Sequence, residues 1–364
     1  MKRVTRHLGL LLLILYLGQG ALTPAAFSQT GELTPKGTTF NRAQVTAWLD
    51  VNRFVVTRWD GTLSVFRPPN SSAEFGPVLT QVLMLPSAKA AEMAAPISQQ
   101  VFVSSNDSGS LAVWVDKNSQ YVLAGTPRYD PKYGTANSAT SLQRAGKQWL
   151  ITGHSEGYII IWEVTGLQLA MRQAVLMRSP DPIPSPFKLW NVRSIVVWKN
   201  GTIVTGAEDG DICLVSVPDG KILARMRYNP SAQRGINSLS LYGDYLILAN
   251  CSVGSSDKNL WLYKLANNQI SLIDSVNLVK DTSLPQVFNF SVQLSPMDNN
   301  LYFFAGTQEG LLWMGHITGD KLVTLTNAKV VCEGGAAIAF QPKPWLLSVV
   351  GFDISLYTVS PKSQ

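Results

Sequence analysis

Short runs of apolar, β-prone residues separated by polar turns recur along the chain. In the clearest cases two such runs flank a turn that contains glycine, as in residues 54–66 and 149–162. Glycine readily adopts the positive φ that tight hairpin turns require, so each pair of runs predicts a β-hairpin. Runs that are apolar at successive positions, such as residues 301–304, indicate strands buried on both faces. The pattern predicts an all-β protein.

The hairpins recur at a regular spacing. Their turn glycines are Gly61, Gly109, Gly157, Gly210 and Gly310. The first three intervals are 48, 48 and 53 residues, and the last, of 100 residues, holds two units because residues 256–263 form a copy without the glycine. A seventh copy lies at residues 351–357. Further β-rich runs accompany the hairpins, and four short strands in about 40–50 residues are typical of a β-propeller blade. The sequence thus predicts seven four-stranded antiparallel blades.

The predicted ring needs its two ends to meet, because unpaired strand edges invite aggregation. The last unit ends after its third strand, near Thr358, so it lacks a fourth. Residues 33–40 have no other evident partner, and Pro35 among them is tolerable in an edge strand. We therefore predict that the N-terminal segment, residues 29–40, pairs into the last blade and that the propeller occupies residues 41–364.

Two stretches carry a resemblance to a known family. Residues 153–163 contain an acidic residue and a glycine in the turn, followed by a strand that ends in Trp162-Glu163. Residues 338–348 are the other close stretch. In these features the chain resembles the WD-repeat propellers, over about residues 41–364. The resemblance implies a propeller fold and says little about function.

The repeats also depart from that family. Its buried histidine network uses a Gly-His pair in the loop before a blade, whereas Gly153-His154 and Gly315-His316 lie in or beside a hairpin. We therefore expect that network to be absent. Residues 219–223 leave open a resemblance to pyrroloquinoline-quinone-type propellers.

The N-terminus has the layout of a secretory signal peptide. Three basic residues precede an apolar run at residues 8–17, and small residues follow. Spanning a bilayer takes about 20 apolar residues, roughly twice this run, so we expect cleavage, after Ser28, rather than a membrane anchor. Residues 1–28 are predicted to be removed on export. The mature protein would then be periplasmic or extracellular and would have no integral membrane span.

The composition adds little to this picture. Charged residues make up 15% of the chain, against about 25% in typical soluble domains, in keeping with strands buried on both faces. The formal charge of +6 includes three basic residues in the leader, so the mature chain has 27 basic and 24 acidic residues, a balance of +3. We therefore expect no nucleic-acid partner. The cysteines are interpreted as buried thiols, with one disulfide as the alternative; they are Cys213, Cys251 and Cys332.

Three long connections join the end of one unit to the start of the next, so they emerge on one face of the ring. They span residues 126–134, 178–190 and 227–234, and four prolines at alternate positions stiffen the second. These connections carry residue types that are enriched at protein interfaces. The predicted binding residues are Arg128, Tyr129, Tyr133, Lys188, Trp190, Arg227 and Tyr228. The alternative is that the aromatic residues only pack the loops against the blades.

Candidate catalytic chemistry is sparse. Histidines and cysteines are isolated in the sequence, so no metal-ligand spacing is present, and we expect neither a metal nor another cofactor. Residues 153–157 match the Gly-x-Ser-x-Gly elbow of esterases, but a strand follows Ser155 where the elbow requires a helix. Four acidic residues at equivalent positions are interpreted as turn residues; they are Glu156, Asp209, Asp257 and Glu309.

Two functions remain after these exclusions. The favoured one is a non-enzymatic platform that binds another protein through the loop-bearing face. The second is a propeller enzyme, a lyase, lactonase or quinone-dependent dehydrogenase, with its site at the central channel, because a fold does not determine function. Carboxylates or histidines that converge at the channel mouth would favour the enzyme.

Overall fold

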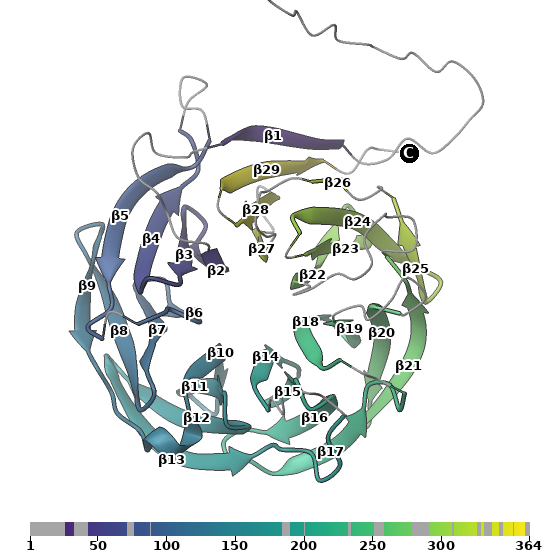
Figure 1. Ribbon diagram of the computed structural model, residues 1–364, viewed down its shortest axis with the longest axis horizontal. Coiled ribbons are helices and arrows are strands. Elements are labelled where there is room, and N and C mark those ends of the chain that lie inside the picture. The colour runs from purple at the N-terminus through teal and green to yellow at the C-terminus, as the bar shows by residue number, and fades with distance from the viewer. Residues whose placement is uncertain are drawn as a thin grey trace, which may run out of the picture.

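The computed structural model shows seven β-sheets arranged as a ring around a central axis (Figure 1). The residues that the structure describes are 26–32, 43–70, 76–87, 89–183, 190–199, 201–231, 234–250, 258–278, 291–307, 309–325, 329–330, 337–341, 345–351 and 353–360. The predicted fold class, an all-β propeller with seven four-stranded antiparallel blades, is confirmed. Within the described residues the one helical element is a short 3-10 helix, η1 (Pro131–Tyr133).

Each blade runs from an inner strand beside the axis to an outer strand at the rim. Blades 1 to 3 consist of β2 (Ala43–Asp50), β3 (Arg53–Arg58), β4 (Thr62–Arg67), β5 (Val78–Met84); β6 (Ala94–Ser98), β7 (Val101–Asp107), β8 (Ser110–Lys117), β9 (Gln120–Gly125); and β10 (Ala136–Arg144), β11 (Lys147–His154), β12 (Tyr158–Thr165), β13 (Gln168–Leu176).

The next three blades repeat this order. They consist of β14 (Val192–Val197), β15 (Thr202–Ala207), β16 (Asp211–Ser216), β17 (Ile222–Arg227); β18 (Ile236–Tyr242), β19 (Tyr245–Asn250), β20 (Leu260–Ala266), β21 (Gln269–Val276); and β22 (Ser291–Met297), β23 (Asn300–Gly306), β24 (Leu311–Thr318), β25 (Lys321–Thr324). A short additional strand, β26 (Lys329–Val330), also pairs with β24.

The last blade joins the two ends of the chain. Its strands are β27 (Ala337–Gln341), β28 (Leu346–Val350), β29 (Ile354–Ser360) and, at the rim, β1 (Ala26–Glu32). β1 runs antiparallel to β29, with Phe27 opposite Val359 and Gln29 opposite Tyr357 (Figure 1). An N-terminal strand therefore closes the ring, as predicted, but it spans residues 26–32 and shares only residues 29–32 with the predicted segment. The closing strand includes residues 26–28, which precede the predicted cleavage point, while residues 33–40 lie outside the described part of the chain.

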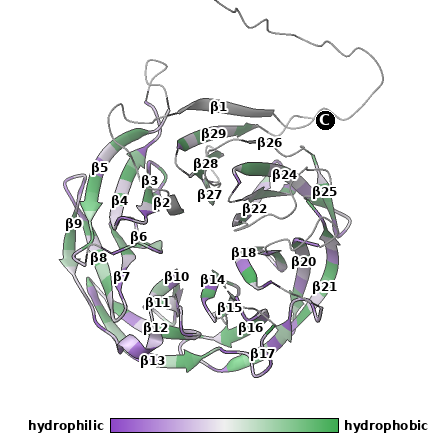
Figure 2. Cartoon of the chain, in the orientation of Figure 1, coloured by the Kyte–Doolittle hydropathy of each residue, from purple (hydrophilic) through white to green (hydrophobic). Residues whose placement is uncertain are grey.

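The core lies between the blades, in clusters that each join two neighbouring sheets. One cluster packs Val103 and Val113 of blade 2 against Leu150 and Ile160 of blade 3. β15 is buried at every position, whereas β13 at the rim is largely exposed. Hydrophobic residues accordingly occupy the strands around the whole ring (Figure 2). Because neighbouring blades cover both faces of the middle strands, truncating one of these side chains to alanine costs about 2–5 kcal/mol.

The structure bears on two further predictions from the sequence. Cys213 is a free, buried thiol on β16, as interpreted, whereas Cys251 and Cys332 lie outside the described residues. None of the described residues forms a helix long and apolar enough to cross a membrane.

Candidate interaction face

The long connections between blades lie on the same side of the ring as the turns between the second and third strands of each blade. Backbone hydrogen bonds show this directly: Tyr129 N–H donates to the Gly109 carbonyl over 2.8 Å, and Met177 N–H donates to the Gly157 carbonyl over 2.8 Å. Tyr228 N–H binds the Gly210 carbonyl in the same way, at 3.1 Å. We call this side the loop face. It combines the predicted long connections with the hairpin turns on which they rest.

Tyr129 anchors the first connection to the blades. Its side chain is 7% exposed, and its hydroxyl lies 3.0 Å from the Gly134 carbonyl and 3.2 Å from the Asp107 carbonyl. Its ring contacts His154 edge-on, with centroids 4.7 Å apart. Burial raises the pKa of the Tyr129 hydroxyl to about 12, so the group stays neutral. Tyr129 therefore holds the loop in place and offers little surface to a partner.

A buried hydrogen-bond chain crosses blade 3 beneath this loop. Trp162 Nε1 donates to Thr152 Oγ1 over 3.0 Å, and Thr152 Oγ1 lies 2.8 Å from His154 Nε2. His154 Nδ1 lies 3.3 Å from the carbonyl of Gly134. Since a carbonyl only accepts, Nδ1 carries the proton, Nε2 accepts from the threonine, and the chain runs in one direction. Burial lowers the pKa of His154 to about 4, so the ring is neutral.

This chain is a different arrangement from the histidine network of the WD-repeat family, so it does not contradict the expectation stated for that network. His154 ends β11, so it reaches the interior from the hairpin instead of from the loop before a blade. Shorter versions occur in two other blades, where Trp114 Nε1 donates to Ser104 Oγ and Trp261 Nε1 donates to Asn250 Oδ1. A tryptophan on the third strand bonded to a polar residue on the second is the signal that sequence reasoning missed.

The residues around the hairpin turn of blade 3 form a continuous, partly exposed surface that we call the blade-3 patch. It comprises Lys132, Tyr133, Glu156, Tyr158, Arg178 and Trp190. At one end the rings of Tyr133 and Tyr158 meet edge-on with centroids 4.8 Å apart, and the Lys132 ammonium lies 5.1 Å from the Tyr133 ring centroid.

At the other end of the patch Arg178 links the acidic residue to the tryptophan. The guanidinium lies 4.1 Å from the Trp190 ring centroid, and its Nη2 is 2.6 Å from Glu156 Oε2. The Arg178 and Glu156 side chains are 34% and 45% exposed, so they hold the tryptophan while remaining accessible. Two of the predicted residues, Tyr133 and Trp190, belong to this patch.

Glycine lets the two halves of the patch approach each other. Gly157 has a φ of +78°, and a Cβ there would lie 2.5 Å from Arg178 Cγ and 3.1 Å from Trp190 Cβ. Gly134 has a φ of +79°, and a Cβ there would lie 2.0 Å from Ser155 Oγ. Any side chain at either position would displace the neighbouring residues.

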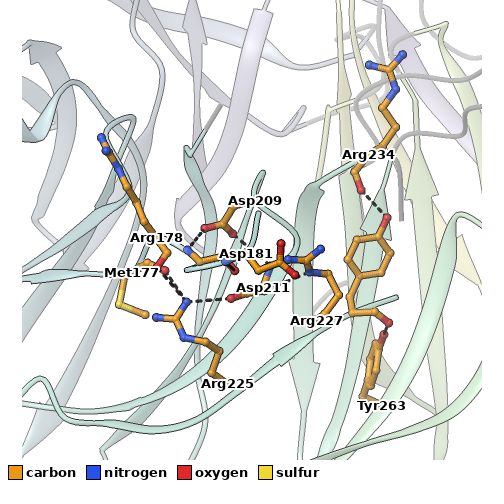
Figure 3. A network of polar contacts seen from close by, with 11 residues as sticks. Met177, Arg178, Asp181, Asp209, Asp211, Arg225, Arg227, Arg234 and Tyr263 are labelled. Carbon is orange, nitrogen blue, oxygen red and sulfur yellow. Dashed lines mark hydrogen bonds and ion pairs between the residues drawn. The ribbon is translucent and has the colours of Figure 1, made fainter. Parts of the chain in front are cut away.

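The remaining predicted residues occupy different environments. Arg128 is exposed on the loop face, and Lys188 lies outside the described residues. Tyr228 is 3% exposed; its hydroxyl donates to the Arg234 carbonyl over 2.5 Å, and its own carbonyl accepts from the Tyr263 hydroxyl (Figure 3). Like Tyr129, it packs a loop against the blades, as the alternative interpretation held. Whether the exposed members contact a partner stays a prediction.

The second connection is fastened to blade 4 by buried charges (Figure 3). Asp209 Oδ2 accepts from the Ser179 N–H at 2.7 Å, which supports its interpretation as a turn residue that binds backbone. Asp211 is paired with Arg225, Nη1 to Oδ2 at 2.9 Å, and with Arg227, Nε to Oδ1 at 3.4 Å. Arg225 Nη1 also donates to the Met177 carbonyl. Arg227 is thus partly engaged inside the protein, and burial raises the pKa of Asp209.

One exposed aromatic residue on the loop face escaped the sequence prediction. Trp59, in the turn between β3 and β4, is 59% exposed. Large exposed tryptophans are frequent hot spots of protein interfaces. The sequence placed this residue in a turn but contained nothing to show that its ring faces solvent.

The comparisons with known proteins concern the fold. No family model matches the chain, and no curated protein sequence matches it. Among solved structures, the chain is similar to the beta-propeller domain of Cps50 (Swd1) from Myceliophteria thermophila, with a TM-score of 0.67. The match covers 92% of this chain and 100% of that one, at 12% sequence identity. The chain has a WD-repeat-like β-propeller fold. Identity this low is informative about architecture alone.

In this WD-repeat-like propeller, the sequence patterns that resemble catalytic or metal sites do not form such sites among the described residues. Ser155 sits in the turn between β11 and β12, where its Oγ accepts from the Thr135 N–H at 3.0 Å. No helix follows it, so the esterase elbow is not formed. Among the described residues, no three histidine, cysteine or acidic side chains gather where they could hold a metal ion. A shallow hollow of about 280 Å³ between Trp198 and Asn267 lies on the face opposite the loops.

Proposed function

We propose that this protein is an exported, non-enzymatic platform that binds another protein through its loop face. The observation that carries the proposal is the blade-3 patch, in which Tyr133, Tyr158 and Trp190 are half-buried and held in place by their neighbours. Aromatic and arginine side chains dominate the binding energy of protein interfaces, and an ordered side chain loses less entropy on binding. The loop face therefore offers a rigid surface of the right composition.

The proposal is tested by capturing partners with matched variants. The whole chain, a Tyr133→Ala/Trp190→Ala double variant and a Tyr242→Ala control are expressed in the native cells and purified by affinity. Tyr242 is 47% exposed at the end of β18 opposite the loop face, so its truncation removes a similar aromatic from an unrelated surface. We expect a defined protein to co-purify with the wild type and the control and to be lost from the double variant. Equal recovery with all three would overturn the loop face as the binding surface.

Export is supported by the N-terminal sequence alone. The apolar run at residues 8–17 and the small residues after it favour a cleaved leader. The intact mass of the protein recovered from its native compartment tests this. A mass equal to that of the full chain would overturn cleavage, and recovery from the cytoplasm alone would overturn export.

A further inference from the structure

The connection that carries part of the blade-3 patch also covers a buried histidine. His154 is 0% exposed, and the ring of Tyr129 meets it edge-on with centroids 4.7 Å apart. The Gly134 carbonyl lies 3.3 Å from His154 Nδ1. Since His154 ends β11 at the loop face, the connection at residues 126–134 separates the ring from solvent. We call His154, Tyr129 and Gly134 the histidine latch; Tyr133 of the patch lies between its last two members in the chain.

The connection is attached to the hairpin turn of blade 3 by bonds that lie outside the strand ladders. Ser155 N–H donates to the Thr135 carbonyl at 2.9 Å, and Glu156 N–H donates to the Tyr133 carbonyl at 3.2 Å. Thr135 N–H donates in return to Ser155 Oγ at 3.0 Å. These bonds can break while the four strands of blade 3 stay paired. Local openings of this kind require less free energy than unfolding of the whole domain.

The closed latch has no place for a second proton on the imidazole. Nδ1 already carries the proton that it donates to Gly134, and Nε2 accepts from the Thr152 hydroxyl. The Thr152 oxygen in turn accepts from Trp162 Nε1. A proton on Nε2 would take away the acceptor of the Thr152 hydroxyl and would place a charge in a water-excluded site. The geometry therefore keeps the ring neutral for as long as the connection covers it.

Within the described part of the chain no counter-ion contacts the histidine. The charged groups on the elements around it are Glu92, Asp107, Arg128, Asp130, Lys132 and Glu156. Three of the carboxylates are bonded elsewhere: Asp107 to Ser110, Asp130 to Lys132 and Glu156 to Arg178. Glu92 and Asp107 act electrostatically on the neutral Tyr129. A protonated His154 would thus stay uncompensated beneath the closed connection, whereas water would hydrate it once the connection lifts.

We propose that the histidine latch holds residues 126–134 on blade 3 at neutral pH and releases them in acid, when His154 is protonated. Release moves Tyr133 away from Tyr158, against which its ring is held with centroids 4.8 Å apart. The blade-3 patch therefore loses its ordered surface as the pH falls. The consequence for a partner rests on the proposed function: a protein bound through this patch at neutral pH is released in acid.

Hydrogen exchange of the whole protein at pH 7 and pH 5 tests the latch without an identified partner. The amides of Ser155 and Glu156 report release, because their bonds end on the connection, and the amides of the fully buried β15 report global unfolding. Burial lowers the pKa of His154 from 6.5 to about 4, so between these values the open form binds a proton that the closed form does not. The opening equilibrium should rise about twentyfold from pH 7 to pH 5. We expect the protection factors of Ser155 and Glu156 to fall by that factor and to stay below those of β15.

His154→Gln and His316→Gln are the matched variants. His154→Gln removes the titrating ring, so its two reporter amides should keep nearly the same protection at both pH values. His316 lies in blade 6, where opening of the latch does not expose it, so His316→Gln should retain the fall. An equal fall in the wild type and His154→Gln would overturn the latch. The wild type by itself also decides the question: unchanged protection between pH 7 and pH 5, or reporter amides that exchange no faster than those of β15, would overturn local release even if a variant failed to fold.

The latch and the platform fail in distinguishable ways. The partner captured at pH 7 is washed at pH 5, and we expect the wild type to release more of it than His154→Gln does. Equal release from both would overturn control of the patch by the latch. Unchanged exchange, together with loss of the partner from the Tyr133→Ala/Trp190→Ala variant, overturns the latch and leaves the platform intact. If that double variant still captures every partner, the blade-3 patch is overturned, and the exchange measurement decides the latch separately.

Discussion

The neutral histidine inside blade 3 makes the propeller sensitive to acid. His154 is 0% exposed, and burial lowers its pKa to about 4 from an ordinary value of 6.5. Above pH 6.5 the imidazole is neutral in both the folded and the unfolded chain, so it adds no pH dependence. Between pH 6.5 and pH 4 the unfolded chain binds a proton that the folded chain does not. Stability contributed by this residue therefore falls as the pH falls through that window.

The size of the effect follows from the two pKa values. Lowering the pH from 7 to 5 should decrease the free energy of unfolding by about 2 kcal/mol through His154 alone. His154→Gln has no titrating ring in this range and can still bond to Thr152 and to the Gly134 carbonyl. The variant is expected to be less stable than the wild type at pH 7 and to lose about 2 kcal/mol less than the wild type on going to pH 5.

Urea titrations at pH 7, 6 and 5, followed by tryptophan fluorescence and circular dichroism, measure this difference. His316→Gln is the control. His316 lies near the C-terminal end of β24, in blade 6, and its side chain is partly exposed. Burial lowers the pKa of His316 too, so the control should lose part of the acid sensitivity, but less than His154→Gln loses, because the His316 ring is only partly buried. If the wild type and His154→Gln lose the same stability between pH 7 and pH 5, protonation of the buried ring is not what destabilises the protein.

Three further outcomes are expected. Tyr129→Phe removes the hydroxyl between two carbonyls and should lower the free energy of unfolding by about 1–2 kcal/mol in a urea titration, whereas Tyr158→Phe should change it little; equal effects would contradict the anchoring role. Burial raises the pKa of Cys213 to about 12. In a variant whose other two cysteines are replaced by serine, Cys213 should therefore react with Ellman's reagent only after unfolding. Rapid labelling of the folded protein would contradict its burial. A chain begun at residue 33 lacks β1, so its free energy of unfolding should fall by a few kcal/mol, at about 1 kcal/mol per backbone hydrogen bond lost, and its melting temperature should fall with it. An unchanged melting temperature would refute closure by β1.

The comparison of Tyr129 with Tyr133 shows where sequence reasoning stops. Both residues lie in the first connection, four positions apart, and both were predicted to contact a partner. The structure buries Tyr129 beneath the loop and leaves Tyr133 partly exposed beside Tyr158. Both rings contact the hairpin of blade 3, Tyr129 at His154 and Tyr133 at Tyr158, and they differ in how deeply each is covered. No composition or spacing within the loop encodes that depth.

The sequence by itself determined the seven blades, the order of their strands and the side on which the long connections emerge. Each of these rests on local information, because a blade is a series of hairpins and successive strands alternate in direction. The ring closure was also predictable, since an incomplete last blade needs a fourth strand.

Only the tertiary structure decided which side chains meet. The bond from Asn137 to Asn191 joins residues 54 positions apart in neighbouring blades, and the histidine chain of blade 3 ends on a carbonyl in the preceding connection. Such contacts form because blades pack face to face around a closed ring, which brings corresponding positions of successive repeats together. The register bulges at Asn137 and Arg193 recur at the start of β2 and β18, so they are a property of the repeat that strand pairing sets and that the sequence did not show.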